Sequence, residues 1–149
     1  MTVVLVFFLF VFSRIFPYLK NFVPLGYDSG LYLYLYRKFS FWPLALWKAA
    51  PIWMQKMFQP GIPVIARILT NFITPEKIII PLIVFFEILF FFAVYILSKK
   101  LWGKKTALWT VFIFACSAIQ FRFYWYYYLK NIAALSFLLF TFYFLPFTF

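Results

Sequence analysis

Residues 74–98 have the sequence TPEKIIIPLIVFFEILFFFAVYILS, an apolar run that opens with helix-start residues. Thr74 suits a helix N-cap, Pro75 suits the first helical position, and Glu76 suits the positive end of a helix dipole. A long apolar run of this kind is typical of a transmembrane helix. The stretch therefore predicts a membrane span over residues 75–98.

The composition of the whole chain supports a membrane protein. The 149 residues are 67% hydrophobic and 11% charged, with a mean hydropathy of +0.96. A soluble domain is usually about 45–50% apolar and about 25% charged. A globule of this size cannot cover so much apolar surface, and disorder requires low hydrophobicity. The net charge of +11 is spread between apolar runs, which favours anionic lipid head groups over nucleic acid as the partner.

Three more apolar stretches accompany the first, so the predicted spans are 2–17, 75–98, 106–128 and 131–149. The first stretch lacks a basic leading region and a small-residue cleavage site, which favours a retained helix over a signal peptide. We expect an all-α integral membrane protein with about four transmembrane helices. Residues 18–73 then form a long first outer loop that contains short interfacial helices.

The orientation follows from four lysines in the connection between the second and third spans: Lys99, Lys100, Lys104 and Lys105. By the positive-inside rule this connection is cytoplasmic, which makes the N-terminus cytoplasmic and places the long loop outside. We expect localisation in the cell (plasma) membrane. Both ends of the chain lack polar flanks, so we expect residues 1–149 to be one membrane domain at the N-terminus of a longer protein.

The outer loop contains alternating Leu and Tyr over residues 31–36, a pattern that fits either a strand or a short interfacial helix. A later segment, 63–72, places several apolar residues on one helical face: Ile65, Ile68, Leu69 and Phe72. Our interpretation is two or three short interfacial helices that dock on the outer ends of the spans.

The titratable residues limit the chemistry. The chain has no His, Cys116 is its single cysteine, and Asp28, Glu76 and Glu87 are its three carboxylates. This excludes His-based catalysis, His-ligated metal and thiolate clusters. Any acid–base step falls on the three carboxylates, Lys or Tyr. We expect no metal and no cofactor.

Several short motifs occur in a recognisable order. They are RIFP at 14–17, GYDSGLY at 26–32, YILSKKLWG at 95–103, QFRFYW at 120–125, and Lys130-Asn131. Together they resemble the N-terminal part of GT-C superfamily glycosyltransferases of the mannosyltransferase and arabinosyltransferase type. These polytopic enzymes transfer a sugar from a polyprenyl-phosphate carrier on the non-cytoplasmic side. The resemblance covers nearly the whole chain.

The resemblance implies that Asp28 is the catalytic residue, as the base or as the group that orients the acceptor. It also implies that a polyprenyl-phosphate sugar and an acceptor of unknown identity are the substrates. Arg14, Arg122 and Lys130 are candidates for binding the lipid phosphate, because a leaving phosphate needs cationic partners. Ser29 follows Asp28 where metal-dependent members carry a second acid, which favours a metal-independent reaction.

The residues by themselves leave alternatives open. Asp28 suits a helix cap. Arg14 can extend to the head groups or pair with Glu87, and Arg122 and Lys130 can act as anchors at the interface. Glu87, in the middle of a span, is expected to be a structural group that is protonated or paired with Arg14 or Arg122.

Two further alternatives concern the aromatic residues and the protein as a whole. Tyr124–Tyr128 suit an interfacial belt or a surface that stacks on a sugar. The alternative function is a small non-enzymatic membrane protein, such as an assembly partner or a transporter piece.

Overall fold

The computed structural model describes residues 2–19, 28–38, 52, 61–120 and 128–145, and all regular structure in these residues is helical. The all-α prediction is therefore confirmed for the described part of the chain. The elements, in order, are α1 (Val3–Ile15), the 3-10 helix η1 (Phe16–Tyr18), α2 (Ser29–Lys38), α5 (Gly61–Leu69), α6 (Pro75–Cys116) and α8 (Leu129–Phe144).

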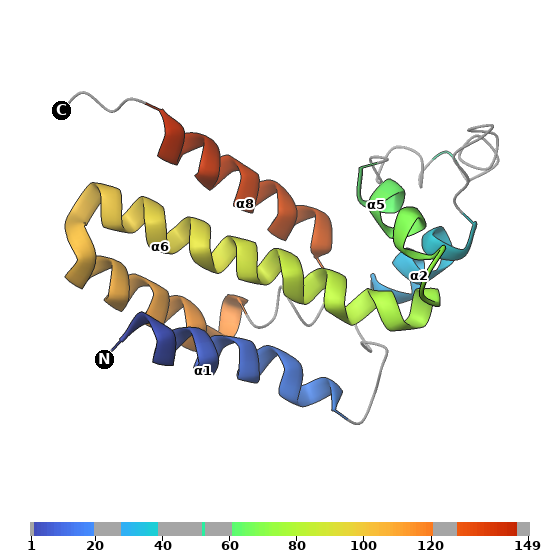
Figure 1. The fold of residues 1–149 in the computed structure, drawn as a ribbon, viewed down its shortest axis with the longest axis horizontal. Coiled ribbons are helices and arrows are strands. Elements are labelled where there is room, and N and C mark those ends of the chain that lie inside the picture. The colour runs from blue at the N-terminus through green and yellow to red at the C-terminus, as the bar shows by residue number, and fades with distance from the viewer. Residues whose placement is uncertain (1, 20–27, 39–51, 53–60, 121–127, 146–149) are drawn as a thin grey trace.

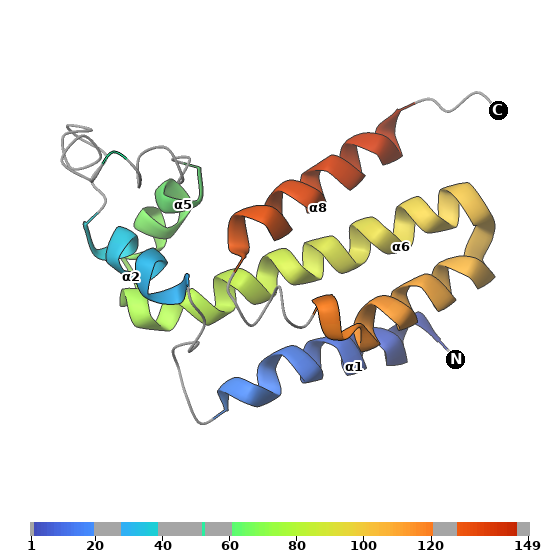
Figure 2. The same cartoon turned by 180° about the vertical axis from the view of Figure 1, so that it is seen from behind.

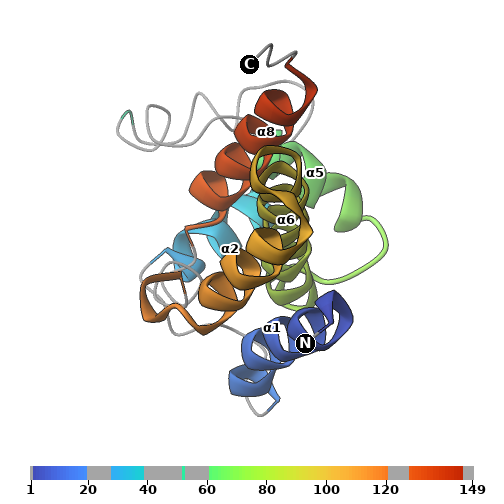
Figure 3. The ribbon, with the colours of Figure 1, turned by 90° about the vertical axis from the view of Figure 1, so that its left-hand side faces the viewer.

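Helix α6 organises the fold because it turns back on itself at Gly103. Its first arm covers residues 75–102 and its second arm residues 104–116. Helix α8 lies along one side of the first arm and α1 along the opposite side (Figures 1 and 3). The N-terminal end of α1, the turn of α6 at Gly103 and the C-terminal end of α8 lie at the same end of the bundle, which we call the Gly103 end (Figure 1). Helices α2 and α5 lie where α6 begins, which we call the α2 end (Figure 2).

The turn at Gly103 differs from the predicted connection. Residues 99–105 are helical on both sides of one glycine with φ 81° and ψ 173°. A positive φ is easily adopted only by glycine, because a Cβ would meet the backbone. The lysines expected in a loop thus lie on the ends of two helical arms.

The start of α6 agrees with its predicted capping residues, but the later helices are shorter than predicted. Thr74 occupies the N-cap position and Pro75 the first helical position, although the Thr74 side chain makes no capping hydrogen bond. The second arm ends at Cys116, because Ser117 is extended with ψ 118°. In the rest of the predicted third span, residues 118–120 are helical, residues 121–127 lie outside the described part of the chain, and Tyr128 is the N-cap of α8.

The fourth predicted span also ends early, and only one helix reaches membrane-spanning length. Helix α8 ends at Phe144, and Leu145 is extended. Among the described residues, α6 is the one helix long and apolar enough to cross a membrane, whereas α1 and α8 are apolar but shorter. The 28 residues of its first arm measure about 42 Å at 1.5 Å per residue, compared with about 30 Å for a hydrocarbon core.

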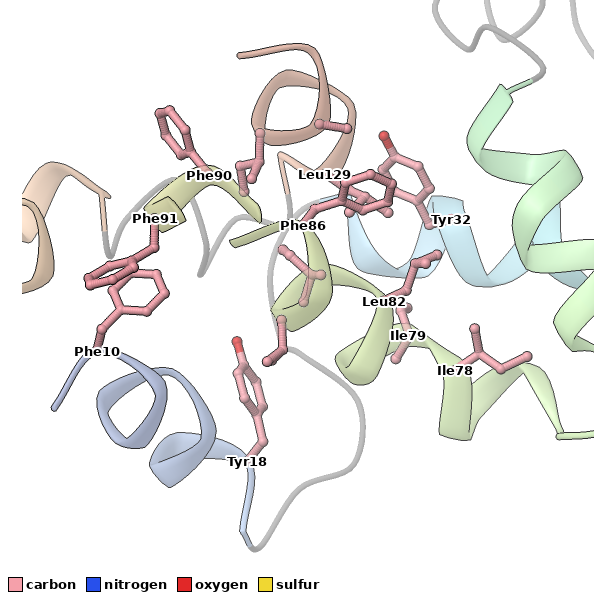
Figure 4. Close-up of a cluster of buried hydrophobic side chains, with 14 of the residues drawn as sticks. Phe10, Tyr18, Tyr32, Ile78, Ile79, Leu82, Phe86, Phe90, Phe91 and Leu129 are labelled. Atoms are coloured by element: carbon pink, nitrogen blue, oxygen red, sulfur yellow. The ribbon is translucent and has the colours of Figure 1, made fainter. Parts of the chain in front are cut away.

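Aromatic packing joins α1 to both arms of α6. The ring of Phe10 lies 5.0 Å from that of Phe91 in the first arm and 5.5 Å from that of Phe114 in the second arm. Figure 4 shows Phe10 and Phe91 facing one another, and Tyr18 pointing from η1 toward α6. Aromatic pairs of this kind, one tilted and one stacked, contribute about 0.5–1.5 kcal/mol each beyond their buried area.

Small buried groups let α8 approach the first arm. The hydroxyl oxygen of Ser136 is fully buried and lies 3.3 Å from the carbonyl oxygen of Phe86 in α6. The same oxygen lies 2.8 Å from the carbonyl oxygen of Ile132 within α8. A small hydroxyl at such a crossing allows close backbone approach and joins the two helices.

Of the two segments expected to lie at the interface, 31–36 lies within α2, and 63–72 is helical up to Leu69, where α5 ends. In α2 the buried side chains are Tyr32, Leu35 and Tyr36, whereas Tyr34 is half exposed. Burial at positions i, i+3 and i+4 follows the helical period rather than the two-residue period of a strand. The alternating Leu and Tyr residues thus form a helix, as the second of the two sequence alternatives predicts.

Candidate functional site

The N-terminal turns of α2 and α8 meet at one tyrosine at the α2 end. Asp28 directly precedes α2, and its carbonyl oxygen accepts a hydrogen bond of 3.0 Å from the backbone N–H of Tyr32. The phenol oxygen of Tyr32 in turn accepts a hydrogen bond of 3.3 Å from the backbone N–H of Lys130, in the first turn of α8. Two residues predicted separately for the site, Asp28 and Lys130, are therefore linked to the same tyrosine through their backbone groups.

Tyr32 fixes this arrangement because it is buried. It is 1% exposed, and Figure 4 shows its ring beside Leu129 and Phe86. Tyr32 lies about one helical turn after Asp28, which directly precedes α2. Burial raises the pKa of Tyr32, the backbone N–H of Lys130 lowers it, and the charge of Asp28 raises it again. The phenol thus stays protonated at neutral pH.

Asp28 has the properties of a strengthened base. Partial burial raises the pKa of its carboxyl above the ordinary value of 3.8, and the positive charge of Lys130 opposes this by lowering it. The carboxylate is half-buried rather than sealed from solvent. A carboxylate with a raised pKa takes up a proton more readily, and a cation beside it can stabilise a developing negative charge on a substrate.

The position of Asp28 also fits a structural role. It is the residue immediately before the first residue of α2, Ser29, which is where an Asp side chain caps a helix. A carboxylate at a helix start interacts favourably with the helix dipole. Capping and acid–base chemistry are compatible, because a cap also fixes the carboxylate in place.

Arg14 and Glu87 form a second charged centre, inside the bundle. Arg14 Nε lies 3.7 Å from Glu87 Oε2, and the two side chains are 1% and 0% exposed. The Arg14 guanidinium also donates to Ser13 Oγ over 2.9 Å and to the carbonyl oxygen of Ala115 over 3.3 Å, and its carbon lies 4.6 Å from the centre of the Phe10 ring. This centre joins α1, the first arm and the second arm.

This geometry corresponds to the pairing alternative for both residues. Arg14 is buried next to Glu87 at the meeting point of three helical segments. A role for Arg14 in phosphate binding stays a prediction. Arg122, the other proposed partner of Glu87 and a predicted phosphate ligand, lies outside the described residues. So does the aromatic stretch 124–127, whereas Tyr128 occupies the N-cap position of α8.

Three contacts of the structure were not predicted from the sequence. The first contact is that of Tyr32, which the sequence does not distinguish from the other tyrosines of the Leu–Tyr alternation. Its position four residues after Asp28 could have indicated a place near that residue. Arg37 donates to Glu76 from its Nε over 3.0 Å and from its Nη2, and so joins α2 to the start of α6. Lys100 donates to the carbonyl oxygens of Tyr143 and Leu145, at 2.8 Å for the latter, a contact with no local sequence signal.

Within the described residues, no group of three or more His, Cys, Asp or Glu side chains could hold a metal ion. Comparisons with protein-family models, with curated proteins and with solved structures give no match. The functional argument for this chain therefore depends on its geometry and its chemistry.

Proposed function

We propose that the chain is the N-terminal part of a membrane glycosyltransferase that uses a polyprenyl-phosphate sugar on the non-cytoplasmic side. In this proposal Asp28 is the general base and Lys130 stabilises the leaving phosphate. The observation that carries the proposal is the meeting of Asp28 and Lys130 at Tyr32, where a carboxylate of raised pKa lies within the influence of a cation.

The arrangement of the helices supports a four-span topology. Helix α1, the two arms of α6 and α8 alternate in direction along the bundle, although the second arm stops at Cys116, short of the α2 end (Figures 1 and 2). The start of α1 and the lysines of residues 99–105 thus share one end, as the positive-inside rule requires of cytoplasmic segments. In this topology the N-terminus is cytoplasmic, the membrane is the plasma membrane, and Asp28 and Lys130 face outward.

The proposed reaction uses each group of the site. The acceptor hydroxyl oxygen attacks the anomeric carbon of the sugar, and its proton passes to the Asp28 carboxylate. The bond between the anomeric carbon and the carrier phosphate oxygen breaks, and the phosphate leaves with the bonding electron pair. Lys130 stabilises the charge that develops on this phosphate. Tyr32 holds the first turn of α8, and hence Lys130, in place relative to Asp28.

One observation favours the second candidate, a non-enzymatic membrane protein. Asp28 is the residue before α2, so its carboxylate can act purely as a helix cap. In that case the residues at the α2 end hold α2 against α8, and the protein acts as an assembly partner.

The substitution Asp28→Asn separates the two functions. Asparagine caps a helix about as well as aspartate, so the fold is kept, but the proton acceptor is lost. Loss of a general base typically reduces the rate by about 10²–10⁴-fold. The measurement is sugar transfer by the protein expressed from its complete reading frame, in membranes supplied with labelled polyprenyl-phosphate sugar and acceptor.

The matched control is Glu76→Gln, which removes another carboxylate at the same end. Glu76 contacts Arg37 rather than the site, so transfer should be unchanged. Transfer by the Asp28→Asn variant within about threefold of wild type, or about 0.65 kcal/mol, would assign Asp28 to capping alone. That result would favour the assembly partner.

A further inference from the structure

The Gly103 end of the bundle contains a cavity that the proposed reaction does not use. Its volume is about 620 Å³, and it lies between the end of the first arm of α6 and the last turn of α8. The lining residues are Tyr95, Ile96, Lys99, Lys100, Tyr143 and Phe144. The cavity thus combines two ammonium groups and two phenols with apolar side chains.

The charge around this cavity is positive and has no acidic counterpart nearby. The chain has three carboxylates: Asp28 and Glu76 at the α2 end, and Glu87 inside the bundle beside Arg14. Residues 99–105 contain four lysines, all with exposed side chains. An anion that approaches this end therefore meets lysine ammonium groups and no acidic side chain.

Lys100 has a fixed position at the cavity wall. Its ammonium donates to the carbonyl oxygens of Tyr143 and Leu145, and it lies 5.2 Å from the centre of the Tyr143 ring. These contacts place a positive charge at the negative end of the α8 dipole. Lys99 is exposed next to it. One cation is thus held by α8, and the second is available to a ligand.

We infer that this cavity binds the head group of an anionic phospholipid. The phosphate fits the available ammonium of Lys99 beside that of Lys100, together with the tyrosine hydroxyls, as in basic pockets between transmembrane helices on the cytoplasmic side. Ile96 and Phe144 add apolar side chains to the lining, and Phe144 is 76% exposed. A free phosphate ion would gain no favourable contact from these apolar side chains.

The surface of α8 provides a path for an acyl chain. Leu135, Leu138 and Phe142 are all exposed and follow one another at helical spacing away from the cavity. A phospholipid whose head group occupies the cavity can therefore lay a chain along α8. The inference rests on the membrane insertion proposed above, and it needs no transferase activity.

The test is a lipid titration of the purified full chain in detergent, followed by native mass spectrometry. The probes are phosphatidylglycerol, phosphatidylcholine and inorganic phosphate. Wild-type protein should retain one phosphatidylglycerol in preference to phosphatidylcholine and should retain inorganic phosphate weakly. Lys99→Gln should weaken phosphatidylglycerol binding about fivefold, the value expected for one lysine near an anionic lipid.

The matched control is Lys77→Gln, which removes an exposed lysine at the opposite end and should leave lipid binding unchanged. Equal retention of the two lipids, an equal loss in both lysine variants, or inorganic phosphate bound as tightly as lipid would each overturn the inference. Carbonate extraction of membranes measures insertion separately. A failure of the lipid site is thereby distinguished from a failure of the membrane proposal, and neither readout involves sugar transfer.

Discussion

Glu87→Gln tests the centre of the bundle, because it removes one charge of a pair that water does not reach. The Glu87 and Arg14 side chains are 0% and 1% exposed, and their closest charged atoms are 3.7 Å apart. This separation is too long for a hydrogen bond, so the attraction is electrostatic. Glutamine keeps the size of the side chain and an oxygen acceptor. The substitution therefore isolates the loss of charge and leaves Arg14 buried without its counter-ion.

The magnitude follows from the distance. Two unit charges 3.7 Å apart attract by about 4–5 kcal/mol at an effective dielectric constant of about 20. Removing one partner of a buried pair typically costs about 3–5 kcal/mol, whereas replacing both with apolar residues is often neutral. The glutamine oxygen recovers part of this loss. We expect Glu87→Gln to lower the free energy of unfolding by about 3 kcal/mol.

The double variant Arg14→Met/Glu87→Leu should return to within about 1 kcal/mol of wild type. The chain also offers an exposed comparison, the pair between Arg37 and Glu76, whose side chains are 55% and 36% exposed. Solvent screens such a pair, so Glu76→Gln should be much less destabilising than Glu87→Gln.

The assay is unfolding of the full chain in mixed micelles by added SDS, followed by far-ultraviolet circular dichroism. Each variant is compared with wild type at the same protein and detergent concentrations. A Glu87→Gln loss no larger than that of Glu76→Gln would refute the electrostatic argument. So would a double variant as unstable as the sum of its two single variants, because uncompensated charge then would not be the cause.

Two other predictions concern topology and pH. In a Cys116→Ser background, a membrane-impermeant thiol reagent applied to intact cells should label Gly61→Cys and leave Lys104→Cys unlabelled; the reverse pattern would contradict the orientation. The rate of sugar transfer should rise with pH through the raised pKa of Asp28, because only the carboxylate accepts the proton. Lys130→Gln should move this inflection to higher pH, since it removes the charge that lowers the pKa, and an unchanged inflection would separate Lys130 from the site.

The sequence predicts the start of α6 well because local chemistry determines it. Thr74 and Pro75 occupy the positions that their capping preferences indicate. The turn is harder to predict, because Lys, Leu and Trp on both sides of Gly103 are compatible with a helix. A single residue at positive φ reverses the chain there, so the helical pattern continues through a segment whose charges suggest a loop.

The candidate site could be predicted only in its separate parts. Asp28 and Lys130 each have a local signal, but they meet through Tyr32, whose partner is distant in the chain. Arg14 and Glu87 also each have a local signal, but their contact joins residues that are distant in the chain. Charged residues in apolar runs are expected to find partners, yet the choice between a partner and the membrane surface depends on how α1 packs against both arms of α6.

The order of synthesis gives the buried pair a consequence for biogenesis. Arg14 leaves the ribosome before Glu87 has been made, since 87 − 14 = 73 residues separate them. At a synthesis rate of about 5–20 residues per second, Glu87 is made about 4–15 s after Arg14. During this interval a lone guanidinium in the hydrocarbon core is costly. In the proposed four-span topology, the first helix therefore reaches its final depth only after α6 has entered the membrane, and the last step of insertion concerns the segment that was made first.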